Sequence, residues 1–277
     1  MGGAALDRRR AAVLGRPVQH SLSPVLHRAA YAALGLAWTY DAIECDEDAL
    51  PGLLAGAGPE WLGFSCTMPL KRAALALASS TTERAVAVGA ANTLLRRSEG
   101  WLADNTDVVG IVAAVRERGV VPKRVTVLGA GSTAQAAVAG LPQLGITECA
   151  VLVRDPAHAS ELRVTAQRVG VQLAVAVLSL DAEPLNADLI IATLPRGAAD
   201  AIASHPWWPG QALLDVIYDP WPTALAASVQ QAGGIVVSGA LMLLHQAAGQ
   251  VELMTGQSAP LEAMRHGLRS AAPAVGV

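Results

Sequence analysis

Short apolar runs alternate with longer stretches rich in alanine and leucine along most of the chain. This rhythm of strand followed by helix favours parallel sheets with helices on their faces, so the sequence predicts the α/β fold class. The predicted strands are short and mostly aliphatic or β-branched. They are Ala11–Leu14, Thr39–Glu44, Leu62–Cys66, Val125–Leu128, Ala150–Val153, Leu189–Ala192, Ala212–Asp215 and Ile235–Val237.

A break in the helical pattern divides the chain into two expected domains. Gly119 and Pro122 end a helical stretch, and a basic pair then precedes the fourth predicted strand. We therefore expect an N-terminal α/β substrate domain over residues 1–118 and a Rossmann-like dinucleotide-binding domain over 119–238. No predicted strand follows the helical run within residues 239–277, so we expect this run to pack back on the first domain and complete it.

Charge and hydropathy narrow the possible partners. Charged residues make up 16% of the 277 residues, the formal net charge is -3 and most arginines are scattered, so no basic field is available for nucleic acid. No apolar run approaches the ~20 residues of a membrane span, so no membrane partner is expected. Cys45, Cys66 and Cys149 lie in apolar runs, and the histidines show no metal-ligand spacing. We expect buried thiols and no metal.

The two ends of the chain carry weaker signals. The cluster Arg8–Arg10 resembles the basic start of a signal peptide, but only Ala11–Leu14 follow before a glycine and an arginine, far short of an apolar signal core. We therefore expect a cytoplasmic protein, either a monomer or a homodimer. The small, uncharged residues 271–277 predict a frayed tail.

A glycine-rich turn follows the fourth predicted strand and opens a helical run. In it, Gly129 permits a tight turn, Gly131 lets the backbone approach a pyrophosphate, and Ala134 lets the helix pack close to the strand. The free N–H groups of the helix start attract the anion, so we assign the whole turn to a dinucleotide cofactor. The expected cofactor-binding residues here are Gly129, Ala130, Gly131, Ser132, Thr133 and Ala134, together with Thr193 after a later strand.

The choice between NADP and NAD is expected at the end of the next strand, where Arg154 and Asp155 are adjacent. Arg154 can form a planar, bidentate pair with a 2′-phosphate. Asp155 stands beside Pro156, where an acid commonly begins a turn or caps a helix. We therefore favour NADP, with NAD as the less favoured cofactor.

Two serines near the N-terminus are candidates for binding a carboxylate. Ser23 followed by Pro24 is typical of a helix N-cap and first turn, so capping alone can explain Ser23. Capping does not require Ser21. Two hydroxyls spaced i, i+2 in an extended loop project to the same side and can grip a small carboxylate.

Lys71 stands in the first turn of a helix that Pro69 is expected to begin. A lysine there is unfavourable, because its positive charge is repelled by the positive end of the helix macrodipole. Its presence therefore suggests a function. Polar clusters at residues 89–93 and 104–107 close or follow strands, although ordinary turns also collect Asn, Asp and Thr. Each of these signals is weak by itself.

Taken in order, these segments resemble the shikimate dehydrogenase family, whose pattern is GxPxxHSxSP, xxTxPxK, GAxNT, DNTD and a Rossmann glycine turn. The matching segments are 15–24, 64–71, 89–93, 104–107 and 129–134. The resemblance extends over roughly residues 11 to 268. It implies NADPH-dependent, reversible reduction of 3-dehydroshikimate to shikimate on the pathway to chorismate and aromatic amino acids.

The resemblance also implies roles for individual residues. The catalytic pair would be Lys71, which gives a proton to the developing alkoxide, and Asp107, which helps to hold the lysine and the substrate. The implied substrate-binding residues are Ser21, Ser23, Thr67, Asn92, Tyr218 and Gln246. Gly239 is implied to contact the nicotinamide.

Several positions depart from the family pattern. Ser65 stands where the family often has Asn, Val108 where Gly is usual, and Asp155 puts a carboxylate beside the 2′-phosphate site. The enzymatic alternative is a quinate/shikimate dehydrogenase that prefers NAD. The non-enzymatic alternatives are a catalytically silent relative that senses a metabolite and a bare dinucleotide sensor.

Overall fold

The computed structural model describes residues 8–276, which form two compact units. The first comprises residues up to 106 together with 246–272, and the second comprises residues 107–245 and those after 272. Each unit has a six-stranded sheet and a buried apolar core of its own, which confirms the predicted α/β class. The expected domain limits at residues 1 and 277 lie outside the described residues.

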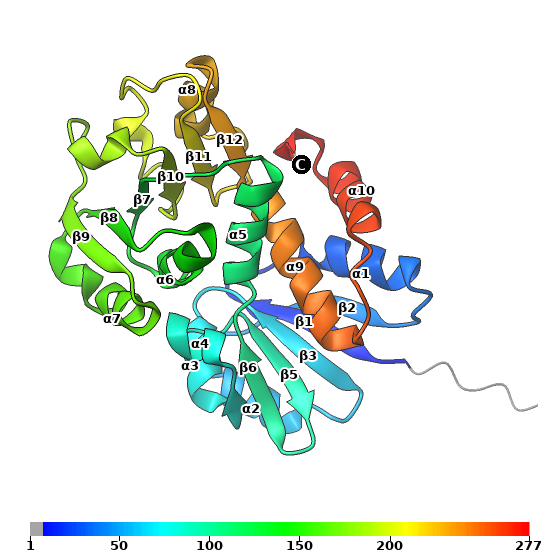
Figure 1. Ribbon diagram of the computed structural model, residues 1–277. Helices are drawn as coiled ribbons and strands as arrows, with labels where there is room; N and C mark the ends of the chain where they lie inside the picture. Colours follow the sequence, from blue (N-terminus) through cyan, green and yellow to red (C-terminus); the bar gives the residue numbers. More distant parts are fainter. Residues whose placement is uncertain (1–7, 277) are drawn as a thin grey trace, which may run out of the picture. The chain divides into compact units, whose positions relative to one another are not determined.

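The first unit contains the strands β1 (Arg10–Gly15), β2 (Thr39–Glu44), β3 (Trp61–Cys66), β4 (Ser80–Thr81), β5 (Thr93–Arg97) and β6 (Gly100–Asp104). Its helices are α1 (Ser23–Ala33), α2 (Leu50–Gly56), α3 (Lys71–Leu77), α4 (Glu83–Val88), the later part of α9 (Gly239–Thr255) and α10 (Leu261–Ala271). The strand order is β2-β1-β3-β5-β6-β4 (Figure 1). β1 pairs in parallel with β2 and β3, whereas β5 pairs antiparallel with β3 and β6.

The second unit contains the strands β7 (Val125–Leu128), β8 (Glu148–Val153), β9 (Gln172–Val177), β10 (Leu189–Ala192), β11 (Ala212–Asp215) and β12 (Ile235–Ser238). Its helices are α5 (Asp107–Glu117), α6 (Ser132–Gly140), α7 (Ser160–Val169) and α8 (Ala224–Gln231), with the 3₁₀ turns η1 (Leu141–Leu144), η2 (Pro156–Ala159), η3 (Glu183–Asn186), η4 (Asp200–Ile202) and η5 (Pro273–Val275). The order is β12-β11-β10-β7-β8-β9, with every pair parallel.

The second sheet is wound in two directions from its middle. The chain moves outward from β7 to β8 and β9, then returns to β10 beside β7 and continues to β11 and β12. Every residue of β7, β10 and β11 is buried, as expected for central parallel strands that are covered on both faces. The carboxyl ends of β7 and β10 therefore form a switch point, which is where ligands bind in open α/β sheets.

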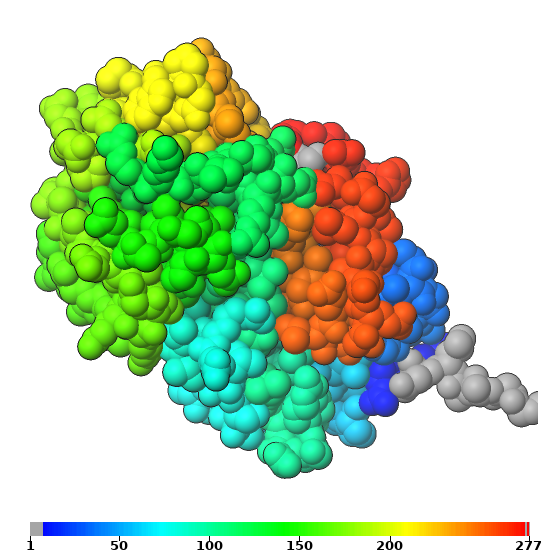
Figure 2. Space-filling model, in the orientation of Figure 1, coloured from blue at the N-terminus to red at the C-terminus, as the bar shows by residue number. Residues whose placement is uncertain are grey.

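The C-terminal helices complete the first unit, as predicted. α10 packs on α1 closely enough that a Cβ on Gly267 would stand 3.0 Å from the Cβ of Ala29. Figure 2 shows α10, in red, on the surface beside α1, in blue. Tyr31 from α1 and Met254 from α9 join one apolar cluster with β1 and β2.

The division between the units differs from the expected limits at 118/119 and 238/239. It falls before α5 and within α9. α5 packs on α6, where a Cβ on Gly140 would approach Val112 Cγ2 to 2.9 Å. His245 in α9 also lies 2.7 Å from the Glu117 carboxylate of α5. These contacts hold α5 and the first turns of α9 to the second unit.

Other local expectations were wrong. The predicted strands omitted β4, β5, β6 and β9, and the frayed tail is contradicted over 271–276. Ala271 still belongs to α10, and the carbonyl of Gly276 accepts hydrogen bonds from Arg118 Nη2 at 3.0 Å and Ser238 Oγ at 3.1 Å. No helix within residues 8–276 combines the length and the apolarity that crossing a bilayer requires.

Candidate active site

The loops that follow β1 and β3 are fastened together at the carboxyl end of the first sheet. Arg16 N–H donates to the Met68 carbonyl at 3.0 Å, and Thr67 N–H donates to the Leu14 carbonyl at 2.9 Å. A Cβ on Gly15 would collide with the Thr67 side chain and the Met68 carbonyl, so this close approach requires glycine. The segment with the paired serines and the segment with Thr67 are thereby held side by side.

Contrary to the sequence prediction, the helix start is not capped by Ser23 but is ordered by Ser21. α1 begins at Ser23 itself, and the preceding residue, Leu22, makes no side-chain cap, so the expected N-cap at Ser23 is wrong. Ser21 Oγ instead accepts the Ser23 N–H at 3.3 Å. A hydroxyl that accepts one hydrogen bond keeps its own proton to donate. Ser21 can therefore order this helix start and still donate to a carboxylate.

The side chain of His27 contacts the backbone of the segment that carries Ser21 and Ser23. The sequence did not identify this residue. Its ring is fully buried, stacks on Tyr40 with 3.9 Å between centroids, and places Nδ1 3.0 Å from the Ser23 carbonyl. Burial lowers the His27 pKa from 6.5 to about 4. The ring is therefore neutral near pH 7, with its proton on Nδ1 facing the carbonyl. A buried histidine at this spacing carries no sequence signal of its own.

Lys71 is in the first turn of α3, as predicted, but the helix begins at Lys71 itself and not at Pro69. Its side chain is half-buried. Its backbone carbonyl accepts the Ala91 N–H at 2.8 Å. That bond fixes the start of α3 beside the segment that carries Asn92. Lys71 and Asn92 are thus positioned by the same local framework.

Asn92 is the centre of a buried hydrogen-bond network in the first unit. Its Nδ2 donates to Gln246 Oε1 at 2.9 Å and to Thr106 Oγ1 at 3.0 Å, while its Oδ1 accepts the Thr106 N–H at 2.8 Å. Two of the predicted substrate-binding residues, Asn92 and Gln246, are therefore in direct contact. Thr106 immediately precedes Asp107, so the network also fixes the backbone from which Asp107 extends.

Gln250 extends this network and was missed in the sequence. Its Oε1 accepts from Ser65 Oγ at 2.8 Å, and its Nε2 donates to Thr93 Oγ1 at 2.9 Å and to the Asn92 carbonyl at 3.2 Å. Tyr40 donates to Ser65 Oγ at 2.5 Å. Gln250 lies four residues after Gln246 on α9, so helical periodicity places both on one face and could have indicated it.

The two aspartates of the polar cluster at 104–107 have different environments. Arg84 binds Asp104 in a fork, with Nε 3.0 Å from Oδ1 and Nη2 2.6 Å from Oδ2. Thr82 Oγ1 and the Asn105 N–H also donate to this carboxylate, each at 2.7 Å. The Asp104 carboxylate therefore has a structural role in joining these segments. Asp107 is buried at the first residue of α5, and a carboxylate there is favoured by the helix dipole.

The glycine turn of the second unit has the geometry expected for binding a dinucleotide. Gly129 has a φ of +105°, and a Cβ on it would approach Thr193 Oγ1 to 2.7 Å. Thr193 Oγ1 in turn donates to the Leu128 carbonyl at 2.7 Å. Gly131 is the extended N-cap of α6, and apart from its two chain neighbours no described atom lies within 4 Å of where its Cβ would stand. The helix start is therefore open to an anion.

Arg154 and Asp155 have different environments, as the sequence suggested. Asp155 is the N-cap of η2, and its Oδ1 accepts the Ala157 N–H at 2.9 Å. Arg154 directly follows β8 and is exposed. The carboxylate is thus used by the local turn, which leaves the guanidinium available to a 2′-phosphate. These residues fit NADP.

The loop after β11 carries Tyr218 and meets the start of α9. Asp215 organises it, because Oδ2 accepts from Thr223 Oγ1 at 2.7 Å and Oδ1 accepts the Ile217 N–H at 3.1 Å. Burial raises the pKa values of Asp215 and Tyr218. A Cβ on Gly239 would collide with the Val216 carbonyl, so Gly239 is required for this loop to lie against α9.

The structure therefore gathers the predicted residues in two sets. Ser21, Ser23, Thr67, Lys71, Asn92 and Gln246 belong to the first unit, whereas Asp107, Tyr218, the glycine turn, Arg154, Thr193 and Gly239 belong to the second. Their roles toward substrate and cofactor stay predictions. Among residues 8–276, no group of three or more His, Cys, Asp or Glu side chains is arranged to hold a metal ion.

Comparison with known proteins gives matches over both ends of the chain. Residues 13–94 match the family model described as the shikimate dehydrogenase substrate binding domain, and residues 239–269 match the shikimate 5'-dehydrogenase C-terminal domain. The NADP(+)-dependent shikimate dehydrogenase of Moorella thermoacetica is 36% identical, over 94% of this chain and 92% of its own length.

Two solved structures are similar along nearly their whole lengths. The shikimate dehydrogenase of Mycobacterium tuberculosis is 47% identical with a TM-score of 0.86, covering 95% of this chain and 99% of that one. The Thermus thermophilus enzyme, solved with NADP(H) and shikimate, is 31% identical with a TM-score of 0.82, at 95% and 99% coverage.

Proposed function

The chain belongs to the shikimate dehydrogenase family, and we propose that it catalyses the reversible, NADPH-dependent reduction of 3-dehydroshikimate to shikimate. It is thus an oxidoreductase that acts on a CH–OH group, in the biosynthesis of chorismate and the aromatic amino acids. The observation that carries this proposal is the buried network around Asn92, which links two predicted substrate-binding side chains to the backbone before Asp107.

The first unit supplies most of the groups that would hold the substrate. The hydroxyls of Ser21 and Ser23 would donate to its carboxylate, with the Ser23 backbone held by neutral His27. Thr67, Asn92 and Gln246 would bind its ring hydroxyls, and Tyr218 would contribute from the second unit. These hydroxyls and amides suit a polyhydroxy acid, because each substrate oxygen can find a donor or acceptor.

The second unit would hold NADP through the glycine turn, with the pyrophosphate at the start of α6 and the 2′-phosphate at Arg154. Gly239 and Thr193 would lie against the nicotinamide side of the cofactor. When bound, NADPH supplies the hydride that reduces the ketone. The residues of this chain orient it and supply the accompanying proton.

The proton step is assigned to Lys71. Its ammonium would donate a hydrogen bond to the ketone oxygen and stabilise the negative charge that develops there, then transfer the proton to the alkoxide. Asp107 would accept a hydrogen bond from the same part of the substrate and help to orient the lysine. Both groups extend from the first residue of a helix, α3 or α5, so a short backbone segment fixes each.

The test is the initial rate of nicotinamide reduction by the purified protein, with shikimate and quinate each tested against NADP and NAD. Of the four pairs, we expect rapid turnover only with shikimate and NADP. A preference for quinate or NAD would move the protein to the neighbouring quinate/shikimate subfamily and make Asp155 the deciding residue. Absence of turnover with all four pairs would favour a metabolite-sensing relative. A cytoplasmic location and a monomeric or homodimeric state stay predictions.

A further inference from the structure

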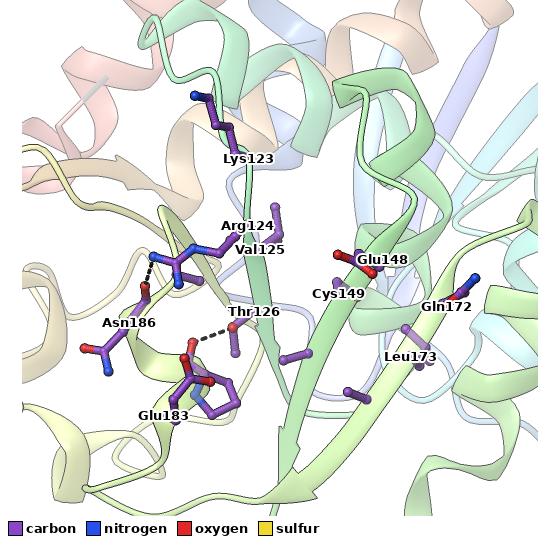
Figure 3. A pocket seen from close by; sticks show the side chains of 14 residues that line it. Lys123, Arg124, Val125, Thr126, Glu148, Cys149, Gln172, Leu173, Glu183 and Asn186 are labelled. Atoms are coloured by element: carbon purple, nitrogen blue, oxygen red, sulfur yellow. Dashed lines mark hydrogen bonds between the residues drawn. The ribbon is translucent and has the colours of Figure 1, made fainter.

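A cavity of about 360 Å³ lies in the second unit, apart from every residue assigned to substrate or cofactor (Figure 3). It is lined by residues at the start of β7, β8 and β9 and by η3. All three strands are parallel, so their amino ends share one edge of the sheet, whereas Gly129 and Arg154 follow carboxyl ends at the opposite edge. The volume is within the range of small-molecule sites.

The cavity exists because small side chains stand in register across three strands. Thr126 pairs with Ala150, and Ala150 pairs with Ala174. Register partners face the same side of a sheet, so the three form one flat floor. Thr126 Oγ1 is committed, since it donates to the Pro184 carbonyl of η3 at 2.6 Å. The rest of the floor, formed by Ala150 and Ala174, is apolar and flat, and a planar group can lie on it.

The rim of this floor carries balanced charge. Glu148 and Gln172 begin β8 and β9, two residues before Ala150 and Ala174, and so face the same side. Arg124 precedes β7, and its Nη2 donates to the Asn186 carbonyl at 2.7 Å and lies 3.9 Å from the Asp188 carboxylate. These contacts hold the guanidinium at the cavity, where it is still largely exposed to a ligand. Glu183 of η3 lines the other side. Lys123 also lines the cavity, so the walls present two cations, two carboxylates and two amides around an apolar floor.

We propose that this cavity is a second binding site, for a small zwitterion with a flat apolar group, such as an aromatic α-amino acid. The carboxylate of the ligand would pair with Arg124, its ammonium with Glu148 or Glu183, and its ring would lie on Ala150 and Ala174. A single net charge would leave one side of the rim unpaired, which selects against simple acids and simple amines.

The test is calorimetric titration of the full-length protein with L-phenylalanine while NADPH and shikimate, two reduced ligands that cannot react with each other, saturate the active site. We expect a dissociation constant on the order of 1 mM, as for a small ligand in a shallow site. Ala174→Leu fills the floor and should weaken binding at least tenfold. The matched control is Ala176→Leu, which makes the same change two residues along β9 on the same face, outside the cavity, and should bind within about twofold of the parent protein.

Four outcomes would overturn the proposal. The first is no detectable binding at about ten times the expected dissociation constant. The second is equal binding of L-phenylalanine by the Ala174→Leu and Ala176→Leu proteins. The third is equal binding of L-phenylalanine, phenylacetate and 2-phenylethylamine by the parent protein. The fourth is a concentration-dependent dimer that Ala174→Leu abolishes without any amino-acid binding, since β9 is an edge strand and a second copy would then be the occupant. None of these results depends on turnover.

Discussion

Gln250 shows how one buried side chain can hold several segments of a binding site. It contacts Ser65, Thr93 and the backbone of Asn92, all of them buried. We expect Gln250→Met to lower the free energy of unfolding by about 1–3 kcal/mol, because these polar groups lose their partner. The KM for shikimate should rise more than kcat falls, because the network positions Asn92 and Gln246 without touching reacting atoms.

Denaturant unfolding and steady-state kinetics check this prediction, with the exposed Gln257→Met as control. The double variant Ser65→Ala/Gln250→Met should lose less stability than the sum of the two single variants, since the bond between these two side chains is lost in each of them. Strictly additive losses, or an unchanged KM, would show that Gln250 is a packing residue only.

Lys71 is the residue whose proposed role is purely chemical. Lys71→Ala should fold, should bind shikimate and should lose at least two orders of magnitude in kcat, because positioned acid–base catalysis contributes ~10²–10⁴-fold. Arg72→Ala removes the same charge from the next position of α3 and should keep near-normal kcat. Circular dichroism, shikimate binding and initial rates together check the outcome. Near-normal turnover of Lys71→Ala would remove this residue from the mechanism.

His27 makes the stability of the first unit depend on pH. Burial lowers its pKa to about 4 from an unfolded value of 6.5, so the unfolded chain binds the extra proton between these two values. Its stabilising contribution is complete above pH 6.5 and is lost as the pH falls toward 4. The free energy of unfolding should therefore fall by about 2 kcal/mol from pH 7 to pH 5 through this residue.

The variant His27→Phe keeps a flat ring against Tyr40 and removes the titration. It should be less stable at pH 7, where the bond to Ser23 is lost, but its unfolding free energy should depend less steeply on pH. The exposed His266→Gln should keep the parental pH dependence. Urea titrations at both pH values give the slopes, and parallel slopes for the parent and His27→Phe would refute the argument.

At the scale of elements, the sequence predicted eight of the twelve strands that residues 8–276 contain. β2, β7, β10 and β11 have the predicted limits, and β1, β3, β8 and β12 are only slightly longer than predicted. β5 and β6 were missed because their hairpin is rich in arginine and polar residues around Gly100, and their pairing is antiparallel. β9 was missed although every residue after Gln172 is apolar, so an apolar run alone did not distinguish this exposed edge strand from its surroundings.

Glycines in different elements should respond oppositely to alanine. Gly52 lies inside α2 with open space at its Cβ position, so Gly52→Ala should raise the free energy of unfolding by about 0.5–1 kcal/mol. Gly129→Ala should be destabilising and should weaken NADP binding, because the φ of +105° and the nearby Thr193 Oγ1 exclude a Cβ. Thermal melting and NADP titration of both variants check this contrast. A stabilised Gly129→Ala would show that the turn is not constrained as described.

At the scale of the whole molecule, the order of motifs identified the family, while the supporting contacts needed the structure. Linear spacing shows which segments bear chemistry, as with Ser21 or Lys71, because each motif is local. It does not show that residues as distant as Ser65 and Gln250 meet, since that depends on how α9 returns to the first unit. The buried neutral state of His27 was hidden for the same reason.

Cofactor choice can be read from the stability of the intact chain. A ligand that binds only the folded state adds about 2.7 kcal/mol at one hundred times its dissociation constant, so equal concentrations of NADP and NAD should raise the melting temperature unequally. We expect the larger rise with NADP, because Arg154 is exposed to a 2′-phosphate while Asp155 caps η2.

Arg154→Ala should remove most of the difference between the two cofactors by lowering the NADP shift and leaving the NAD shift unchanged. Arg163→Ala, an equal loss of charge on the exposed side of α7, should preserve the difference. Differential scanning calorimetry of the three proteins with each cofactor gives the comparison. A larger shift with NAD in the parent protein would mean that Asp155 leaves its cap to bind the ribose, and the preference would then follow the carboxylate.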